Sequence, residues 1–541
     1  MKTRFFLRTR IFLCVMIFTF ITFAVIPKSR ALGSGASANL NAQQDAAKKT
    51  ATGGLTPDTL LVKLQADPNQ PPIELTLKQF MEKYNIPGLS VAVIDNYKIA
   101  WTGAFGVTVP GGTEPVTTST LFQAGSISKP VAAVGAMWLV EHGKLSLDED
   151  VNKKLKTWKV PENEFTKDQK VTLRRLMSHS AGLTVHGFPG YAVGTPVPTL
   201  VQIFNGEKPA NTDPIRVDFV PGTKMRYSGG GVTIEQQLVI DVTGRPFPQF
   251  MHDTVLSKLG MTDSTYEQPL PPARAAHTAT GARPNSKPVE GRWHIYPEMA
   301  AAGLWTTPTD LAKFAIEIAL SKQGKANHVL SQNSVQEMLT PQIKTGDSDG
   351  SSVGLAFFLG GPQNPDQFGH NGADEGFQAN LIMLGDSGKG LAIMGNSDTF
   401  FYIAPRVLEL VAREYDWKFT PDPEPAAEAL MLVENVKGTE AALNFYQRIK
   451  DGTAKGFKAD ESSLNTMGYH LLAQKRIDEA IKVFQLNVQE YPNASNPYDS
   501  LGEAYMTAGK KDLAIKSYEK SVELNPKNAN GVAMLKKLKG E

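Results

Sequence analysis

Cysteine is almost absent from this chain of 541 residues, and its scarcity limits how the fold can be held together. The single cysteine, Cys14, lies within an apolar run near the beginning of the sequence. A disulfide-bonded scaffold is therefore excluded, and stability must come from a hydrophobic core. We find no His-Glu-x-x-His motif, no close group of residues with zinc-ligand spacing and no glycine-rich phosphate loop, so neither a metal nor a cofactor is expected.

Long apolar runs are also rare, and the one exception covers residues 11–26. Basic residues precede this run and small residues follow it, which is the pattern of a secretory signal peptide at residues 1–31. The alternative is an uncleaved N-terminal membrane anchor. We therefore expect an exported protein, periplasmic or extracellular, that is attached to a membrane only if this segment stays uncleaved.

Clusters of basic residues are missing outside that first segment. Residues 1–31 hold six basic and no acidic residues, which leaves 50 Lys and Arg against 54 Asp and Glu, a net charge of −4. Such a mildly acidic chain lacks the cationic surface that nucleic acids require. Binding to DNA or RNA is not expected.

Composition divides the rest of the chain into four segments. Residues 32–73 begin with a small and polar stretch, and we expect a flexible tether. Residues 74–416 have strand-like runs at both ends and helical patterns between them, which predicts an α+β domain: an antiparallel sheet flanked by helices, with a helical lobe. Residues 417–429 contain three prolines and read as a linker, and residues 430–541 read as all-α.

The strand-like runs of the α+β domain are short and well separated. Residues 89–106 predict two strands around an Asp95-Asn96 turn. The runs expected near the end of the domain are "VGLAFFLGG", "FQANLIMLG" and "GLAIMGN". Because these strands lie at the two ends of the domain, we expect its terminal segments to close one sheet.

The all-α segment contains an internal repeat with a constant offset of 34 residues. This period and pattern resemble tetratricopeptide repeats, in which small residues let the large residues of paired helices interlock. Residues 440–449 resemble half of a third repeat. The matched pairs are Gly468 and Gly502, Leu471 and Tyr505, Ala480 and Ala514, Phe484 and Tyr518, and Pro492 and Pro526.

One serine and one lysine stand three residues apart at the beginning of a long apolar helix, in "AGSISKPVAAVGAMWLVEHG". This spacing places Ser126 and Lys129 on one helix face, and a buried lysine beside a serine loses proton affinity. A neutral amine can accept the serine proton and so activate a nucleophile. The alternative is that Ser126 only caps the helix and Lys129 points into solvent. A second Ser-x-x-Lys, Ser517 to Lys520, is interpreted as an exposed helix face in a repeat.

The sequence around Ser126 resembles that of a known enzyme family, and this resemblance favours the nucleophile over the helix cap. The chain resembles the serine β-lactamase and penicillin-binding-protein superfamily, specifically its class C-like branch, from about residue 75 to residue 415. The blocks that carry the resemblance, in family order, are "IPGLSVAVI", "FQAGSISKP", "LMSHSAGL", "RYSGGG", "KLGMTDSTY", "AAGLWTTPTDLAKFA" and "FGHNGADEGF".

The resemblance implies three catalytic motifs. Ser126 with Lys129 is the first, and Tyr227-Ser228-Gly229 stands where the family usually has Tyr-x-Asn, so that Tyr227 acts as a phenolate or relays a proton. Gly229 lacks the asparagine amide, which weakens the case for β-lactam hydrolysis. For the third motif we prefer His370-Asn371-Gly372 to the literal Lys344-Thr345-Gly346, because it leads into two strands as the family's edge strand does.

These motifs imply a serine hydrolase that works through an acyl-enzyme. The implied oxyanion hole consists of the backbone N–H groups of Ser126 and Ala373, and Gly372 lets the substrate approach. His370 orients the substrate, or its carboxylate if it has one, or joins the proton network. His179 is expected to be structural. The substrate is a small-molecule or peptide ester or amide, for a carboxyesterase or a D-Ala-type (D-aminoacyl) peptidase. The alternative function is a non-catalytic cell-wall-peptide or partner-binding protein, and a protein partner could bind the repeats.

Overall fold

The computed structural model describes residues 61–347, 349–419 and 424–540. The predicted signal peptide and the tether as far as residue 60 lie outside the described residues. None of the helices in the described ranges combines the length and the apolar character needed to cross a membrane.

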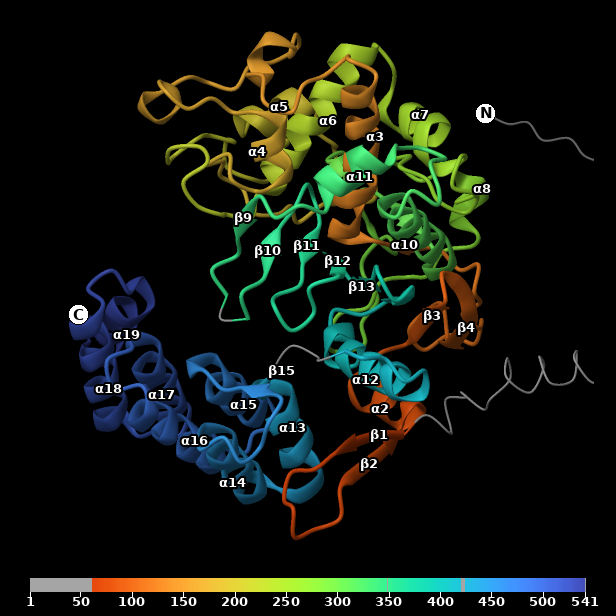
Figure 1. Ribbon diagram of the computed structural model, residues 1–541. Coiled ribbons are helices and arrows are strands. Elements are labelled where there is room, and N and C mark those ends of the chain that lie inside the picture. Colours follow the sequence, from red (N-terminus) through yellow and green to blue (C-terminus); the bar gives the residue numbers. More distant parts are fainter. Residues whose placement is uncertain (1–60, 348, 420–423, 541) are drawn as a thin grey trace, which may run out of the picture. The chain divides into compact units, whose positions relative to one another are not determined.

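A sheet of eight described strands forms the centre of the α+β domain and confirms the predicted fold class (Figure 1). Its neighbouring strands are antiparallel, in the order β4-β3-β14-β13-β12-β11-β10-β9. The strands are β3 (Gly88–Asp95), β4 (Lys98–Gly106), β9 (Ile343–Lys344), β10 (Ser352–Val353), β11 (Phe358–Leu359), β12 (Gln367–Asp374), β13 (Phe377–Leu384) and β14 (Lys389–Gly395). Strand β3 pairs with β14, so the two ends of the domain close the sheet as predicted.

Both faces of the central strands are buried, because alternate residues pack into two different cores. On β3, Ala92 and Ile94 belong to the core that includes α10 (Pro308–Lys322), while Val91 and Val93 belong to the core on the opposite face. That second core includes α2 (Leu77–Lys83) and α12 (Ala404–Glu414), which Figure 1 shows across the sheet from α10. Burial of side chains such as these contributes about 1.5–3 kcal/mol each.

The helical lobe lies between the N-terminal and C-terminal strands in sequence and carries the residues around Ser126. Its main helices are α3 (Ser128–Glu141), α4 (Leu173–Met177), α6 (Gly229–Thr243) and α9 (Met299–Ala302). The other α-helices of this part are α5 (Leu200–Asn205), α7 (Phe247–Met251), α8 (Pro272–Ala275) and α11 (Gln332–Met338), and the short strands are β5 (Phe122–Gln123), β6 (Tyr191–Ala192), β7 (His294–Ile295) and β8 (Trp305–Thr306).

The structure differs from the predicted segment boundaries at both ends of the domain. Residues 61–73 were expected to belong to the tether, but β1 (Leu61–Leu64) pairs with β2 (Ile73–Thr76). Leu64 and Ile73 are buried in the second core, which explains why this hairpin is ordered. Within the predicted linker, Trp417 is buried and α13 (Ala426–Lys437) already begins at its end.

The run "VGLAFFLGG" forms two short strands rather than the one strand-like segment expected. Strands β10 and β11 pair with each other across residues 354–357. Ala356 lies in the left-handed backbone region at φ 66°, which an extended strand does not allow. Hydrophobic composition alone did not reveal this turn, because all four intervening residues are buried.

The C-terminal segment is helical, and its paired helices agree with the predicted repeats. The helices are α13, α14 (Thr439–Lys450), α15 (Glu461–Ala473), α16 (Ile477–Glu490), α17 (Ser495–Thr507), α18 (Lys511–Leu524) and α19 (Ala529–Lys539), with a short β15–β16 pair (Glu424–Pro425 and Phe457–Lys458) beside them. A Cβ atom at Gly468 would lie 2.5 Å from the ring of Phe484, so this position must be small for the two helices to interlock. Leu430 and Val433 of α13 share the second core with α2 and α12.

Candidate active site

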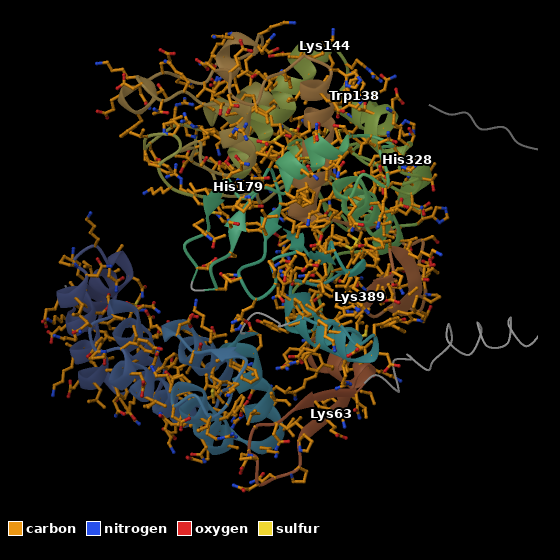
Figure 2. All side chains as sticks on the ribbon, in the orientation of Figure 1. Lys63, Trp138, Lys144, His179, His328 and Lys389 are labelled. Atoms are coloured by element: carbon orange, nitrogen blue, oxygen red, sulfur yellow. The ribbon has the colours of Figure 1, made fainter. Side chains whose placement is uncertain are left out.

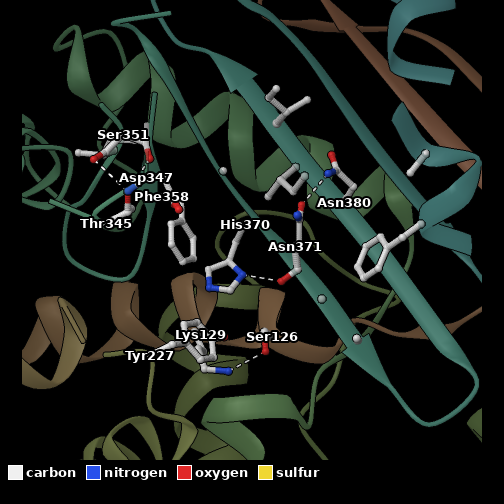
Figure 3. A pocket seen from close by; sticks show the side chains of 18 of the residues that line it. Ser126, Lys129, Tyr227, Thr345, Asp347, Ser351, Phe358, His370, Asn371 and Asn380 are labelled. Carbon is white, nitrogen blue, oxygen red and sulfur yellow. Dashed lines mark hydrogen bonds between the residues drawn. The ribbon is translucent and has the colours of Figure 1, made fainter. Parts of the chain in front are cut away.

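Ser126 and Lys129 are in direct contact at the start of α3. Ser126 lies in the 3-10 turn Gly125–Ile127 that precedes the helix, and it is partly exposed between buried neighbours. The ammonium nitrogen of Lys129 is 2.8 Å from the Oγ atom of Ser126 (Figure 3). Because Lys129 is only 2% exposed, the alternative in which it points into solvent is excluded.

A second hydrogen bond fixes Lys129 in this position. Its Nζ atom donates to the backbone carbonyl of Ala301 at 2.7 Å. Helix α9, which contains Ala301, is held in turn by Gln236 of α6, whose side chain accepts from the backbone N–H of Ala300 at 2.9 Å. Three helices of the lobe therefore determine where the amine of Lys129 lies.

The environment of Lys129 favours a neutral amine. Burial lowers the pKa of Lys129 to about 7, and the nearby carboxyls of Asp374 and Glu235 act in the opposite direction. Near neutral pH a large fraction of this side chain can accept a proton from the Ser126 hydroxyl.

Tyr227 lies on the same side of the pocket as the serine and lysine. Its ring centroid is 4.9 Å from the Lys129 Nζ atom, and its hydroxyl is hydrogen-bonded with Ser126. Burial raises the pKa of Tyr227 above its ordinary value, so the phenol stays neutral at physiological pH. Of the two roles expected for Tyr227, the environment favours proton relay over a phenolate base.

His179, labelled in Figure 2, is a positioning residue for Tyr227. It follows α4, is buried, and has its ring centroid 4.2 Å from that of Tyr227. Its Nδ1 atom accepts a hydrogen bond from the backbone N–H of Ser228 at 3.2 Å, which fixes the next residue of the motif. The structural role expected for His179 agrees with these contacts.

The chain around Gly229 leaves little room for a side chain at this position. A Cβ atom at Gly229 would lie 3.1 Å from the carbonyl oxygen of His186 and 3.1 Å from the ring of Phe188. The backbone N–H of Gly229 also donates to that same His186 carbonyl at 2.9 Å. Residues 186–188 therefore occupy the space into which a larger side chain would extend.

Two glycines bring the backbone nitrogens of Ser126 and Ala373 together. A Cβ atom at Gly125, which has φ +50°, would lie 2.4 Å from the nitrogen of Ala373. A Cβ atom at Gly372 would lie 3.1 Å from the nitrogen of Ser126. This close approach of strand β12 to the serine turn agrees with the oxyanion hole that the family resemblance implies.

His370 lies on β12 and faces the pocket from the opposite side. Its ring is 6.0 Å from the Tyr227 ring and 5.1 Å from the Phe358 ring, measured between centroids. Its Nδ1 atom is hydrogen-bonded to the carbonyl oxygen of Asn371 (Figure 3). Burial lowers the pKa of His370 to about 3, so the imidazole is neutral and offers a hydrogen bond rather than a charge.

Strand β12 is not the edge strand that was expected, because three short strands continue the sheet beyond it. However, β11 pairs only with Phe368 and Gly369 of β12. No described strand pairs with residues 370–374 on that side, so this half of β12 retains the character of an edge.

Neither rejected lysine lines the pocket of Ser126, although Thr345 of the Lys344 motif does. Lys344 is exposed on β9, and its Nζ atom donates to the carbonyl of Gly350 at 3.0 Å. Lys520 forms an ion pair with Glu523 at 2.7 Å on the surface of α18, as expected. Ser517, in contrast, is buried, so the prediction that the whole Ser517–Lys520 face is exposed was wrong for the serine.

Three buried carboxyls near the site were not found by sequence reasoning. Glu235 of α6, Glu298 beside α9 and Asp374 of β12 are all nearly inaccessible to solvent. Burial raises the pKa of Glu235 and of Glu298 to about 8, and it raises that of Asp374 well above its ordinary value. The available signal was an acidic residue within an otherwise apolar or small-residue segment, as in "GGGVTIEQQLV".

Ser126, Lys129, Tyr227, His370, Gly372 and Ala373 all line one pocket of about 880 Å³. The sequence-predicted site residues are therefore brought together, although they come from α3 and its preceding turn, the segment just before α6, and strand β12. A nucleophile, an amine of lowered pKa, a neutral phenol and two converging backbone nitrogens can together support acyl transfer.

Comparison with known proteins finds a family match in each of the two parts of the chain. The family model described as Beta-lactamase matches residues 73–412, and that described as Tetratricopeptide repeat matches residues 496–528. A Beta-lactamase from Pseudomonas fluorescens is 29% identical over 245 residues, covering 45% of this chain and 62% of that protein. The chain thus spans less than two thirds of the length of that relative.

Two further similarities concern penicillin-binding proteins. Penicillin-binding protein 4 from Amycolatopsis lactamdurans is 26% identical over 363 residues, covering 63% of this chain and 91% of that protein. The fold is similar to that of the octameric penicillin-binding protein homologue from Pyrococcus abyssi, with a TM-score of 0.53, 23% identity, and coverage of 62% of this chain and 75% of that one. The chain belongs to the β-lactamase family and continues into C-terminal tetratricopeptide repeats.

Proposed function

We propose that this protein is an exported serine hydrolase that forms an acyl-enzyme on Ser126 and cleaves an ester or amide. The observation that carries the proposal is the 2.8 Å contact between the Lys129 amine and the Ser126 hydroxyl, in a site where burial lowers the pKa of the lysine. The serine hydrolase activity expected for members of the β-lactamase family gives the same reaction class.

In the acylation step, the Oγ atom of Ser126 bonds to the carbonyl carbon of the substrate and its proton passes to the neutral amine of Lys129. The backbone N–H groups of Ser126 and Ala373 stabilise the oxyanion, a contribution of about 3–4 kcal/mol for one such donor. The hydroxyl of Tyr227 gives a proton to the leaving group as the bond to it breaks, and the Lys129 proton replaces it. Water then releases the acyl group and restores the Ser126 hydroxyl.

Within this class, a carboxyesterase or a D-aminoacyl peptidase fits the site better than a β-lactamase. The position that carries an asparagine amide in the family motif is Gly229, and the segment 186–188 fills the adjacent space. A substrate amide therefore lacks one hydrogen-bonding partner there. Assignment to the class C-like branch remains a prediction.

Export is proposed from the sequence, because basic residues and an apolar run precede the described part of the chain. A periplasmic or extracellular location would follow. Fractionation of the producing cells, together with the N-terminal sequence of the product, tests both export and cleavage near residue 31. A full-length product in the cytosolic fraction would contradict this part of the proposal.

Reaction of the purified protein with a fluorophosphonate probe tests the nucleophile. We expect covalent label on Ser126, and we expect Ser126→Ala to lose both the label and ester turnover while keeping its thermal transition. Ser128→Ala is the matched control, because Ser128 is a neighbouring serine that is fully buried and donates to the carbonyl of Gly125 instead. A folded wild-type protein without label would favour the alternative function, a non-catalytic protein that binds cell-wall peptides or a partner through its repeats.

A further inference from the structure

The residues that line the pocket around Ser126 include more acidic than basic side chains. Among the described residues that line it, Lys129 is the only lysine or arginine. Its ammonium nitrogen is already used by the Ser126 hydroxyl and by the Ala301 carbonyl. No cationic side chain of the lining is therefore left to pair with a carboxylate of a substrate.

His370, one of the two histidines of the lining, does not replace that cation. His370 is neutral, with its Nδ1 atom hydrogen-bonded to Asn371 and a pKa lowered to about 3. The ring of His186 packs against the ring of Tyr227, with 4.9 Å between the centroids. The expectation that His370 could bind a substrate carboxylate therefore loses its electrostatic basis.

Two aspartates of the loop between β9 and β10 add negative charge to the pocket lining. Asp347 and Asp349 are both exposed and both line the pocket. They are engaged in local backbone contacts: the N–H of Asp347 donates to the Thr345 hydroxyl, and Asp349 accepts from the N–H of Ser351 at 2.9 Å. Lys344, at the start of the same loop, donates to the Gly350 carbonyl instead of pairing with either aspartate.

The remaining walls supply apolar surface. Phe188 and Phe358 line the pocket near the tyrosine, and Phe401 and Leu408 line it where α12 approaches the sheet. Figure 3 shows Phe358 beside His370, and Asn371 with Asn380 farther along the strands. The Asn380 amide nitrogen donates to the side-chain oxygen of Asn371 at 2.6 Å, whereas the Oδ1 atom of Asn380 has no hydrogen-bond partner among the described residues.

From these observations we propose that the site accepts esters and amides that carry no carboxylate beside the scissile bond, and that it prefers a cationic or neutral group there. This inference rests on the proposed acyl-transfer function and specifies its substrate. Penicillins and the C-terminal residue of a peptide both place a carboxylate next to the amide that is cleaved. A substrate with an amino group or an uncharged group in that place avoids repulsion by Asp347 and Asp349.

Three aryl esters of one acyl group, phenylacetylglycine, test the proposal with the full-length protein. Their leaving groups are 3-hydroxybenzoate, 3-hydroxybenzamide and 3-hydroxyphenyltrimethylammonium, which differ chiefly in charge. We expect kcat/KM to be at least about tenfold lower for the anionic ester than for the neutral one, and highest for the cationic one, after correction for the spontaneous hydrolysis rate of each ester.

The preference for the cationic ester over the anionic one can be tested with a matched variant and a control. The double variant Asp347→Asn with Asp349→Asn should reduce the cation-over-anion ratio by about three- to tenfold and shift KM more than kcat. Asp168→Asn, at an exposed aspartate outside the pocket lining, should leave the ratio unchanged.

The outcomes separate the two proposals. Equal kcat/KM values for the three esters, or a preference for the anionic ester, would overturn the substrate assignment while leaving the hydrolase intact. Hydrolysis that persists in Ser126→Ala, or no hydrolysis of any ester by the folded wild type, would overturn the proposed function and this inference with it.

Discussion

The pH dependence of acylation is the most specific consequence of the buried lysine. Burial lowers the pKa of Lys129 from 10.5 to about 7. This difference corresponds to about 5 kcal/mol between its two protonation states. Only the neutral amine can accept the Ser126 proton, so the active fraction rises as pH rises through the pKa.

The magnitude follows from that value. With a pKa of about 7, roughly half of the enzyme carries a neutral lysine at pH 7, and about 1% does so at pH 5. An ordinary lysine, with a pKa of 10.5, would be neutral in only about one molecule in 3,000 at pH 7. We therefore expect kcat/KM for a neutral ester to fall by about 90-fold from pH 8 to pH 5 and to level off above about pH 8.

The assay is the initial rate at low substrate concentration across that pH range, with spontaneous hydrolysis subtracted and the fold monitored by circular dichroism. The variant Lys129→Arg stays protonated throughout and should lose activity by at least about 1,000-fold at every pH. A rate independent of pH between 5 and 8, or one that still rises steeply above pH 9, would refute the role assigned to Lys129.

Three further predictions concern packing. Gly372→Ala should reduce kcat by about 100-fold or more, because its Cβ atom would lie 1.9 Å from the carbonyl oxygen of Ala124 and push β12 away from the serine turn; steady-state kinetics on the folded variant measure this. In the repeats, Gly468→Ala should lower the free energy of unfolding by about 1–3 kcal/mol, and Gly502→Ala should lower it by less. The reason is that the new Cβ atom would lie 2.5 Å from the facing aromatic ring at position 468 and 3.1 Å from it at position 502. Urea denaturation compares the two variants, and equal losses would contradict the helix spacing. Truncation after residue 419 should cost at least about 3 kcal/mol and lower the soluble yield, because it uncovers the core shared with α13; unchanged stability and activity would indicate a separate recruitment module.

Much of the fold could be predicted, because strong local patterns specify it. The strands around Asp95-Asn96 are bounded by a turn and rich in β-branched residues, and the structure places them as β3 and β4. The 34-residue offset identified the repeats, because each small residue must face a large one on the paired helix. Residues 61–73 were misjudged because two buried side chains, Leu64 and Ile73, were enough to order a hairpin next to a polar stretch.

Part of the site could be predicted, and part depends on tertiary contacts. The three-residue spacing of Ser126 and Lys129 places them on one helix face, but their contact also depends on the burial of Lys129 and on its hydrogen bond to the Ala301 carbonyl. The burial of Glu235 and Asp374 was not predicted, since acidic residues are usually exposed and only the apolar or small residues around Glu235 indicated otherwise. The segment 186–188 beside Gly229 also comes from a distant part of the sequence. The sequence therefore showed only that the asparagine amide is missing, and not that little space is left for a side chain.

Detection of the acyl-enzyme itself tests the central claim most directly. The full-length protein would be mixed with p-nitrophenyl acetate, quenched in acid within milliseconds to seconds, and analysed by intact mass and peptide mapping. We predict a transient mass increase of one acetyl group, located on Ser126 and absent from Ser126→Ala. Ester turnover without any adduct on Ser126, or an adduct that persists in Ser126→Ala, would contradict the account.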